Sequence, residues 1–320
     1  MPRVFLTGVT GQDGSYLSER LVADGWEVHG LVRSGEREGE QPLPDGVVPH
    51  TGDLADPDGL SEIVVGVRPD LVVNLGGITS VALSWQRPAM TGTVTGVAVA
   101  ALVEACERVG DDVRLVQASS AEIFAGSGVD PQDESTPIVP TSPYGTAKAF
   151  AHRTVQLARS RGRWASNAIL YNHESLRRPH AFASRKITDG VARIALGVAD
   201  RIELGNLDAG RDWGWAPDHV DAILRIAQAE QPGDYVVATG EVHTVREFVY
   251  AAFAAAGIDD PERYIVIDPK LLRPNDAPAL RGDATRLRTE LGWRPTMTFE
   301  DVVGAMVRHD MDLLSNGLPR

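Results

Sequence analysis

The chain has 320 residues, 43% of them apolar, which is enough to bury a large core in one domain or in two closely joined ones. Its formal net charge of −13 argues against nucleic-acid binding, which needs a surplus of Lys and Arg to neutralise phosphates. A single cysteine, Cys106, the lack of an export signal and the lack of an uncharged apolar run of about 18 residues predict a soluble, cytoplasmic protein without a disulfide or membrane span.

Short apolar runs alternate with stretches of helical spacing over the first half of the chain. The expected strands are residues 3–7, 27–32, 47–51, 71–75, 113–118 and 164–170. The expected helices between them are residues 15–23, 60–67 and 98–109. This alternation predicts right-handed βαβ units and a parallel sheet.

The pattern loosens after about residue 171, where Gly- and Pro-bearing loops separate the expected helices. These helices are residues 184–196, 217–229, 245–256 and 299–314. We expect this half to cover the ligand edge of the sheet. The Gly, Glu and Pro-rich segment 34–46 is predicted to be a loop.

A glycine-rich turn follows the first expected strand. It reads Gly8-Val9-Thr10-Gly11-Gln12-Asp13-Gly14 and leads into a helix. Such glycines permit a tight turn and close backbone approach to a pyrophosphate, and the helix N-terminus offers its N–H groups to the anion. An ordinary strand-to-helix turn has a similar composition, but the place inside a βαβ unit favours a dinucleotide site.

The end of the second strand selects between NAD and NADP. An acid there binds the ribose 2′-OH, whereas a basic residue accepts a 2′-phosphate. Arg33 ends this strand, about 20 residues after the glycines, with no acid beside it. The residue therefore predicts NADP, with an exposed arginine at a strand end as the alternative.

Two residues four apart form a candidate acid–base pair. Tyr144 and Lys148 lie on a helix expected to begin near Pro143, and this spacing places both side chains on one face. A lysine ammonium beside a phenol favours the phenolate, so Tyr144 is a candidate base for a hydroxyl proton.

Two further polar residues stand at the carboxyl end of the fifth strand, where parallel sheets present ligand-binding groups. Ser120 can hydrogen-bond the hydroxyl that Tyr144 deprotonates. Glu122 can remove a carbon-bound proton next to a ketone, a step that a simple dehydrogenase does not need. An exposed loop acid is the alternative interpretation of Glu122.

Together, the glycine turn, the serine and the Tyr144–Lys148 pair resemble the extended short-chain dehydrogenase/reductases. Longer strings are similar to the GDP-mannose 4,6-dehydratases within that family, and they run nearly end to end. They are GVTGQDGSYL at 8–17, YNHES at 171–175, SRKI at 184–187, LGNLD at 204–208, RDWG at 211–214, ATG at 238–240, VREF at 245–248 and LGW at 291–293.

The resemblance implies an internal redox cycle on GDP-mannose that uses NADP. Hydride leaves C4, water is lost across C5 and C6, and the hydride returns to C6, giving GDP-4-keto-6-deoxymannose. In this scheme Tyr144 is the base, Lys148 lowers its pKa, Ser120 replaces the usual threonine and Glu122 removes the C5 proton.

The resemblance also implies the binding residues, and no metal. Cofactor contacts are expected from Gly8, Thr10, Gly11, Gln12, Asp13, Gly14, Arg33, Asp53, Leu54, Leu75, Gly76, Thr79, Lys148, His173 and Arg178. Substrate contacts are expected from Asn172, Glu174, Lys186, Arg211 and Arg273. Arg211 and Arg273 are also plausible diphosphate ligands by their chemistry, because guanidinium groups match phosphates.

The implied fold is an α/β, Rossmann-like doubly wound parallel sheet with a smaller, interleaved C-terminal α/β substrate domain. Residues 1–171 and 212–240 are assigned to the NADP-binding domain, and residues 172–211 and 241–320 to the substrate domain. A homo-oligomer is implied. The loop after Arg33 is shorter than in relatives, where this loop reaches a neighbouring subunit's cofactor, so a dimer is expected and a tetramer is left open.

Two other functions remain open at this point. A GDP-4-keto-6-deoxyhexose reductase or a nucleotide-sugar epimerase would share the fold, but a reductase does not need Glu122 as a C5 base. A non-catalytic NADP-binding sensor would need the glycines and Arg33, but not Tyr144 and Lys148. Ala121 and Met90 depart from the residues usual in dehydratases, which bears on substrate more than on chemistry.

Overall fold

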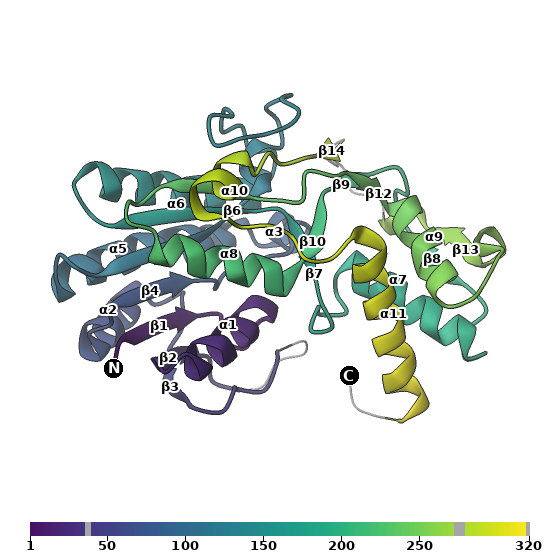
Figure 1. The fold of residues 1–320 in the computed structure, drawn as a ribbon, viewed down its shortest axis with the longest axis horizontal. Helices are drawn as coiled ribbons and strands as arrows, with labels where there is room; N and C mark the ends of the chain where they lie inside the picture. Colours follow the sequence, from purple (N-terminus) through teal and green to yellow (C-terminus); the bar gives the residue numbers. More distant parts are fainter. Residues whose placement is uncertain (36–39, 272–278, 318–320) are drawn as a thin grey trace.

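The computed structural model describes residues 1–35, 40–271 and 279–317, and a seven-stranded parallel sheet forms its centre (Figure 1). The strand order is β11-β6-β5-β4-β1-β2-β3. The strands are β1 (Arg3–Thr7), β2 (Glu27–Val32), β3 (Val47–Thr51), β4 (Leu71–Asn74), β5 (Arg114–Ser120), β6 (Ala165–Leu170) and β11 (Asp234–Val237). The chain reverses direction along the sheet between β1 and β4, so the doubly wound fold is confirmed.

All six predicted strands are present, with ends within two residues of the expected ones. β11 was not predicted. It pairs in parallel with β6 and extends the sheet at its edge. Its four residues, DYVV, are a short apolar run in the half of the chain where the periodic pattern is weak.

Helices cover both faces of this sheet. In β1, Val4 and Leu6 pack on one face and Phe5 on the other, because successive side chains of a strand point to opposite sides. The helices around the sheet are α1 (Gln12–Ala23), α2 (Pro57–Val67), α3 (Val81–Gln86), α4 (Pro88–Thr91), α5 (Ala98–Val109), α6 (Pro143–Ser160), α8 (Ala216–Gln228) and α10 (Thr285–Leu291). Both faces are therefore dry, as expected for a parallel sheet.

The predicted helix 98–109 is longer than expected. A π-helical segment, η1 (Gly92–Val97), joins α4 to α5, so the helix is continuous over Pro88–Val109. Within the described residues it alone is long and apolar enough to cross a membrane by length and composition, but Glu104, Glu107 and Arg108 lie within it, so it holds no uncharged run of about 18 residues. Its inner side chains, such as Val99 and Leu102, lie in the core beside α2 and α6, so internal packing accounts for its apolar character.

A smaller unit begins where β6 ends. Three short sheets belong to it, together with helices that surround a separate core. Its strands are β7 (Asn172–Glu174), β8 (Ile202–Leu204), β9 (Gly210–Arg211), β10 (Trp213–Trp215), β12 (His243–Thr244), β13 (Ile265–Ile267) and β14 (Ala279–Leu280). Its helices are α7 (Ala183–Ala195), α9 (Val245–Ala255) and α11 (Phe299–Ser315), which lie together on the right in Figure 1.

The helices of the second half begin and end within one residue of their predicted bounds. α10 differs, since it was not predicted. Its Leu287, with Leu280 and Trp293 nearby in the chain, packs into the core of the large sheet and not into that of the smaller unit. The chain therefore returns to the first unit after residue 279, within the stretch assigned to the substrate domain.

Candidate active site

The glycine turn between β1 and α1 has no room for side chains. Gly8 has a φ of +69°, and a Cβ on Gly14 would lie 2.0 Å from the Gly8 carbonyl oxygen. Gly11 caps α1 without a side-chain hydrogen bond, so the first N–H groups of the helix face outward. Such a turn suits a pyrophosphate, which needs close backbone approach and N–H donors.

Side chains from the same turn reach across to β7. The Gln12 amide donates to the His173 carbonyl at 3.1 Å and accepts from the Ser175 hydroxyl at 2.8 Å. Asp13 and His173 approach to 2.9 Å. Gln12 and Asp13, expected to contact cofactor, thus also hold the cofactor turn against the start of the smaller unit.

The contacts of His173 favour its protonated, cationic form. Its Nδ1 faces the Tyr171 carbonyl at 2.7 Å and its Nε2 faces the Asp13 carboxylate, so both ring nitrogens have acceptors as partners. Burial opposes the charged forms, but the mutual attraction raises the pKa of His173 and lowers the pKa of Asp13 to about 2. His219 stacks on His173 at 4.3 Å between ring centroids, and burial holds the pKa of His219 well below its usual value.

The carboxyl ends of β3 and β4 complete the expected cofactor edge. A Cβ on Gly76 would lie 2.7 Å from Leu54 Cδ1, and one on Gly8 would lie 2.9 Å from the Gly76 nitrogen. Asp53 accepts from the Ala55 N–H at 2.9 Å. The structure therefore brings the loops after β1, β3 and β4 together, as the sequence predicted for one ligand site.

Arg33 directly follows β2, and its ion-pair partner was not expected from the sequence. Its guanidinium pairs with Glu40, which follows it in the loop. The next residue, Gln41, donates its backbone N–H to the Thr10 carbonyl at 2.7 Å, so the loop folds back onto the glycine turn. The residue expected to bind a 2′-phosphate thus has a carboxylate beside it.

Tyr144 and Lys148 lie on the face of α6 that meets the end of β5. Lys148 donates from Nζ to the Ala118 carbonyl at 2.7 Å, and this nitrogen lies 5.9 Å from the centre of the Tyr144 ring. The Ser120 hydroxyl lies near enough to Tyr144 to act on its pKa, and its oxygen accepts from the Glu122 N–H at 3.3 Å. The four predicted catalytic residues therefore occupy one site.

The electrostatics of the pair differ from the expectation that Lys148 lowers the phenol pKa. Burial raises the pKa of Tyr144 to about 12, outweighing the hydrogen bond with Ser120, and the charge of Glu122 also raises it. Burial lowers the pKa of Lys148 to about 8. The phenol is thus protonated in the protein alone, because desolvation penalises both charged forms.

Glu122 lies in a 3₁₀ turn, Ala121–Phe124, directly after β5. It is half-buried, and its charge acts on the Tyr144 phenol. The turn that carries it begins at the residue after Ser120, so one strand end places both side chains. A carboxylate, a hydroxyl and a phenol therefore converge at the carboxyl end of β5.

A family model described as GDP-mannose 4,6 dehydratase matches residues 5–306. The chain belongs to this family. GDP-mannose 4,6 dehydratase 1 of Arabidopsis thaliana is 41% identical over 96% of this chain and 89% of its own length. The human GDP-mannose 4,6 dehydratase is 38% identical over 97% of this chain and 91% of its own length.

Solved structures agree on the dehydratase fold. RMD from Pseudomonas aeruginosa, solved with NADPH, has a TM-score of 0.81 and 25% identity, covering 98% of this chain and 100% of that one. A putative epimerase from Burkholderia cenocepacia has a TM-score of 0.83 and 27% identity, covering 97% of this chain and 98% of that one. The family relatives favour the dehydratase over the reductase and epimerase alternatives.

The residues expected to bind substrate in this dehydratase are only partly gathered. Glu174 is fully buried, with Arg178 at 3.0 Å and the Ser184 hydroxyl at 2.6 Å. Arg211 is buried and donates to the Gly210 carbonyl at 2.6 Å. Asn172 begins β7, Lys186 is exposed on α7, and Arg273 lies outside the described residues. Thr79, which was expected to contact the cofactor, is exposed after β4.

A row of buried polar side chains was missed by the sequence analysis. Asn74 hydrogen-bonds Thr7 and donates to Gln117 at 2.6 Å, and Gln117 donates to the same Ala118 carbonyl that Lys148 uses. The available signal was a polar residue inside an apolar strand, since buried polar groups require partners. The row connects the loops after β1 and β4 to Lys148.

Proposed function

We propose that this chain catalyses the NADP-dependent dehydration of GDP-mannose to GDP-4-keto-6-deoxymannose, with Ser120, Glu122, Tyr144 and Lys148 as its catalytic residues. The observation that carries the proposal is the convergence of Glu122 with Tyr144 at the end of β5 in a member of the dehydratase family. A reductase on this fold would use the tyrosine and lysine without the acid.

The residues divide the proton transfers between them. Tyr144 first gives its phenol proton to solvent, and its phenolate then takes the C4 hydroxyl proton as the alcohol becomes a ketone, while Ser120 holds that oxygen by a hydrogen bond. Glu122 takes the C5 proton, which the ketone acidifies, and passes it to the C6 hydroxyl, so that the C6–O bond breaks and water leaves. C5 regains a proton from solvent when C6 is reduced. When bound, NADP supplies the acceptor for the C4 hydride and the donor for C6. One water is lost and the cofactor is unchanged overall.

Incubation of the purified protein with GDP-mannose tests the proposed function. We expect a product lighter by one water, no net NADPH, and one solvent deuteron at C5 in heavy water. Stoichiometric consumption of NADPH with a ketosugar, without water loss from GDP-mannose, would support the reductase instead.

We expect Glu40 to weaken NADP binding, because its carboxylate occupies Arg33 and repels a 2′-phosphate. Glu40→Gln should lower the Kd of NADP about fivefold, the range of an exposed ion pair, and leave that of NAD unchanged. Titration of cofactor-free protein measures both constants. Glu62→Gln, which breaks the distant pair with Arg108, is the matched control for net charge. Equal NADP affinity in both variants would contradict the prediction.

For the substrate, we propose that Asn172, Glu174, Lys186, Arg211 and Arg273 contact the GDP-sugar. The domain division at residues 171–172, 211–212 and 240–241 stays a proposal, with α10 added to the NADP-binding side because Leu287 packs in that core. We also propose a cytoplasmic location, since Cys106 is buried and burial raises its thiol pKa to about 12, as in an inert structural cysteine.

We propose a homo-oligomer formed through an apolar groove between Pro88–Val109 and α6. Trp85, Val97 and Phe150 line it and are exposed, and no charged residue is among the lining residues. A second copy is the occupant that fits, because two chains of net charge −13 repel least at an uncharged apolar face.

Phe150→Glu should therefore dissociate the oligomer, because it places a carboxylate in the apolar contact and opposite its own copy. Light scattering after size-exclusion chromatography should give a monomer mass for the variant and at least twice that mass for the wild type. Leu196→Glu, at an exposed apolar residue outside the groove, is the control. A monomeric wild type would refute the proposal.

A further inference from the structure

Three side chains, one turn apart, fasten α6 to the end of β5. The Tyr144 phenol lies near the Ser120 side chain, which acts to lower its pKa, and Lys148 donates to the Ala118 carbonyl at 2.7 Å. His152 follows at the same spacing, and its Nδ1 lies 3.0 Å from the Ser119 hydroxyl. The first two side chains belong to the proposed catalytic group, whereas His152 has no assigned role.

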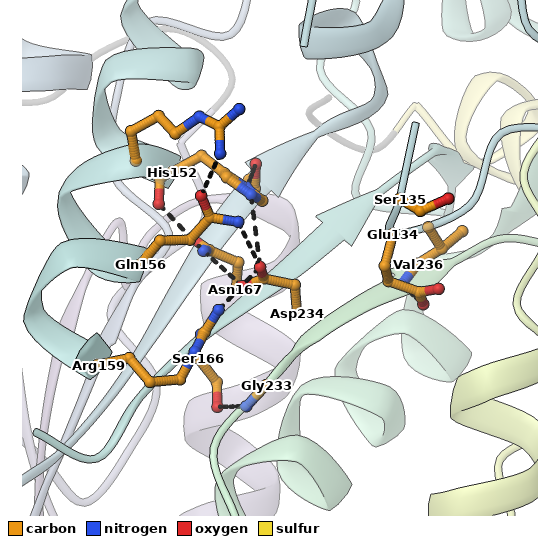
Figure 2. Close-up of polar contacts among 12 residues, drawn as sticks. Glu134, Ser135, His152, Gln156, Arg159, Ser166, Asn167, Gly233, Asp234 and Val236 are labelled. Atoms are coloured by element: carbon orange, nitrogen blue, oxygen red, sulfur yellow. Dashed lines mark hydrogen bonds and ion pairs between the residues drawn. The ribbon is translucent and has the colours of Figure 1, made fainter. Parts of the chain in front are cut away.

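The far side of His152 faces a carboxylate on β11 (Figure 2). Asp234 lies 3.7 Å from His152 Nε2 and 2.8 Å from Arg159, and it accepts from the Gln156 amide at 2.6 Å. The Asn167 amide on β6 donates to the same carboxylate at 2.8 Å. This polar cluster connects His152, Gln156 and Arg159, on successive turns of α6, to β6 and β11. These two strands lie next to each other at one edge of the sheet.

The state of His152 follows from its neighbours. Burial lowers its pKa to about 4, although Asp234 opposes the change, so the ring is neutral at ordinary pH. The Ser119 hydroxyl then donates to Nδ1, and the Nε2 proton points toward Asp234. The hydrogen bond has a defined direction that an apolar residue cannot supply.

A nucleophilic role does not fit this cluster. Ser, His and Asp are the residue types of a hydrolytic triad, but Ser119 and His152 are only 3% and 2% exposed. A serine nucleophile must reach its substrate, and this hydroxyl is occupied inside the fold. The neighbouring Ser120 hydroxyl, in contrast, meets Tyr144 in the site.

We infer that His152 is a positioning residue, whose hydrogen bond to Ser119 sets the register of α6 against β5 and so the placement of Tyr144 and Lys148. The inference rests on the proposed function. Its physical basis is that α6 carries the pair, while β5 and the turn directly after it carry Ser120 and Glu122, so a small slide of the helix changes every distance between them. Misplacement of reacting groups by about 1 Å is costly in rate even when binding is intact.

Ser119→Ala is the central test, because it removes one buried oxygen and leaves charge and shape nearly unchanged. We expect kcat for GDP-mannose dehydration to fall about tenfold. The KM for GDP-mannose and the amount of NADP that the purified protein retains should stay near wild-type values, since no binding group is removed. Ser160→Ala is the matched control, as its hydroxyl donates to the Leu157 carbonyl at the exposed end of the same helix.

Two substitutions of His152 separate positioning from stability. His152→Leu should lower kcat more than Ser119→Ala does. His152→Asn keeps an acceptor near the Nδ1 position, so its kcat should be higher than that of His152→Leu. Wild-type kcat in Ser119→Ala and His152→Asn, with only a lower Tm, would overturn the inference. If His152→Leu fails to fold, Ser119→Ala decides alone. A wild type that does not dehydrate GDP-mannose would overturn the proposed function as well.

Discussion

Glu122→Gln is expected to stop water loss from GDP-mannose, with the dehydration rate lowered about a thousandfold. The amide keeps the shape of the side chain but cannot accept the C5 proton. Tyr144, Lys148 and Ser120 are untouched, so oxidation at C4 remains available to the variant. Part of the bound NADP should therefore be reduced when GDP-mannose is added and should stay reduced.

Three measurements check this outcome. Mass spectrometry follows water loss, NADPH absorbance follows the stalled oxidation, and deuterium at C5 follows the proton transfer. The exposed Glu230, changed to Gln, controls for the loss of one negative charge. Full dehydration by the Glu122→Gln protein would remove this residue from the mechanism.

Tyr144→Phe is expected to lower kcat about a thousandfold, because the C4 proton loses its acceptor before any later step. Unlike Glu122→Gln, this variant should reduce no bound NADP. The phenyl ring retains the buried packing of Tyr144, so Tm and cofactor retention should change little. Reduction of NADP at the wild-type rate would show that another group takes the proton.

The pH dependence of the wild type probes Lys148, the partner of Tyr144. Burial lowers the lysine pKa to about 8, so the ammonium is charged below this pH and loses its proton as the pH rises through it. The phenolate of Tyr144, which must exist before C4 oxidation to accept the hydroxyl proton, then loses a nearby cation. We expect kcat to decline above about pH 8, and a rate that is flat across that range would contradict a role for the lysine charge.

Local patterns were sufficient for most of the fold. The strands β1, β2 and β3 begin and end where their sequence patterns do, because each is bounded by turn residues, and β1 and β2 are also buried on both faces. The exceptions have tertiary causes. The predicted helix begins at residue 98, yet the observed helix also runs through Gly92 and Gly96, and Gly96 packs closely against Ala147 of α6.

For the site, the sequence by itself determined the glycine turn, the Tyr144–Lys148 spacing and the strand end that carries Ser120 and Glu122. These features depend on residues within a few positions of one another, where backbone geometry alone sets which side chains are neighbours.

Only the tertiary structure decided the partners and the charge states. Asp13 meets His173, Arg33 meets Glu40, and His152 joins Ser119 to Asp234 across three separate elements. Burial, not the nearby lysine, determines the direction of the Tyr144 pKa. Desolvation and long-range contacts depend on how the whole chain packs, and no local spacing encodes them.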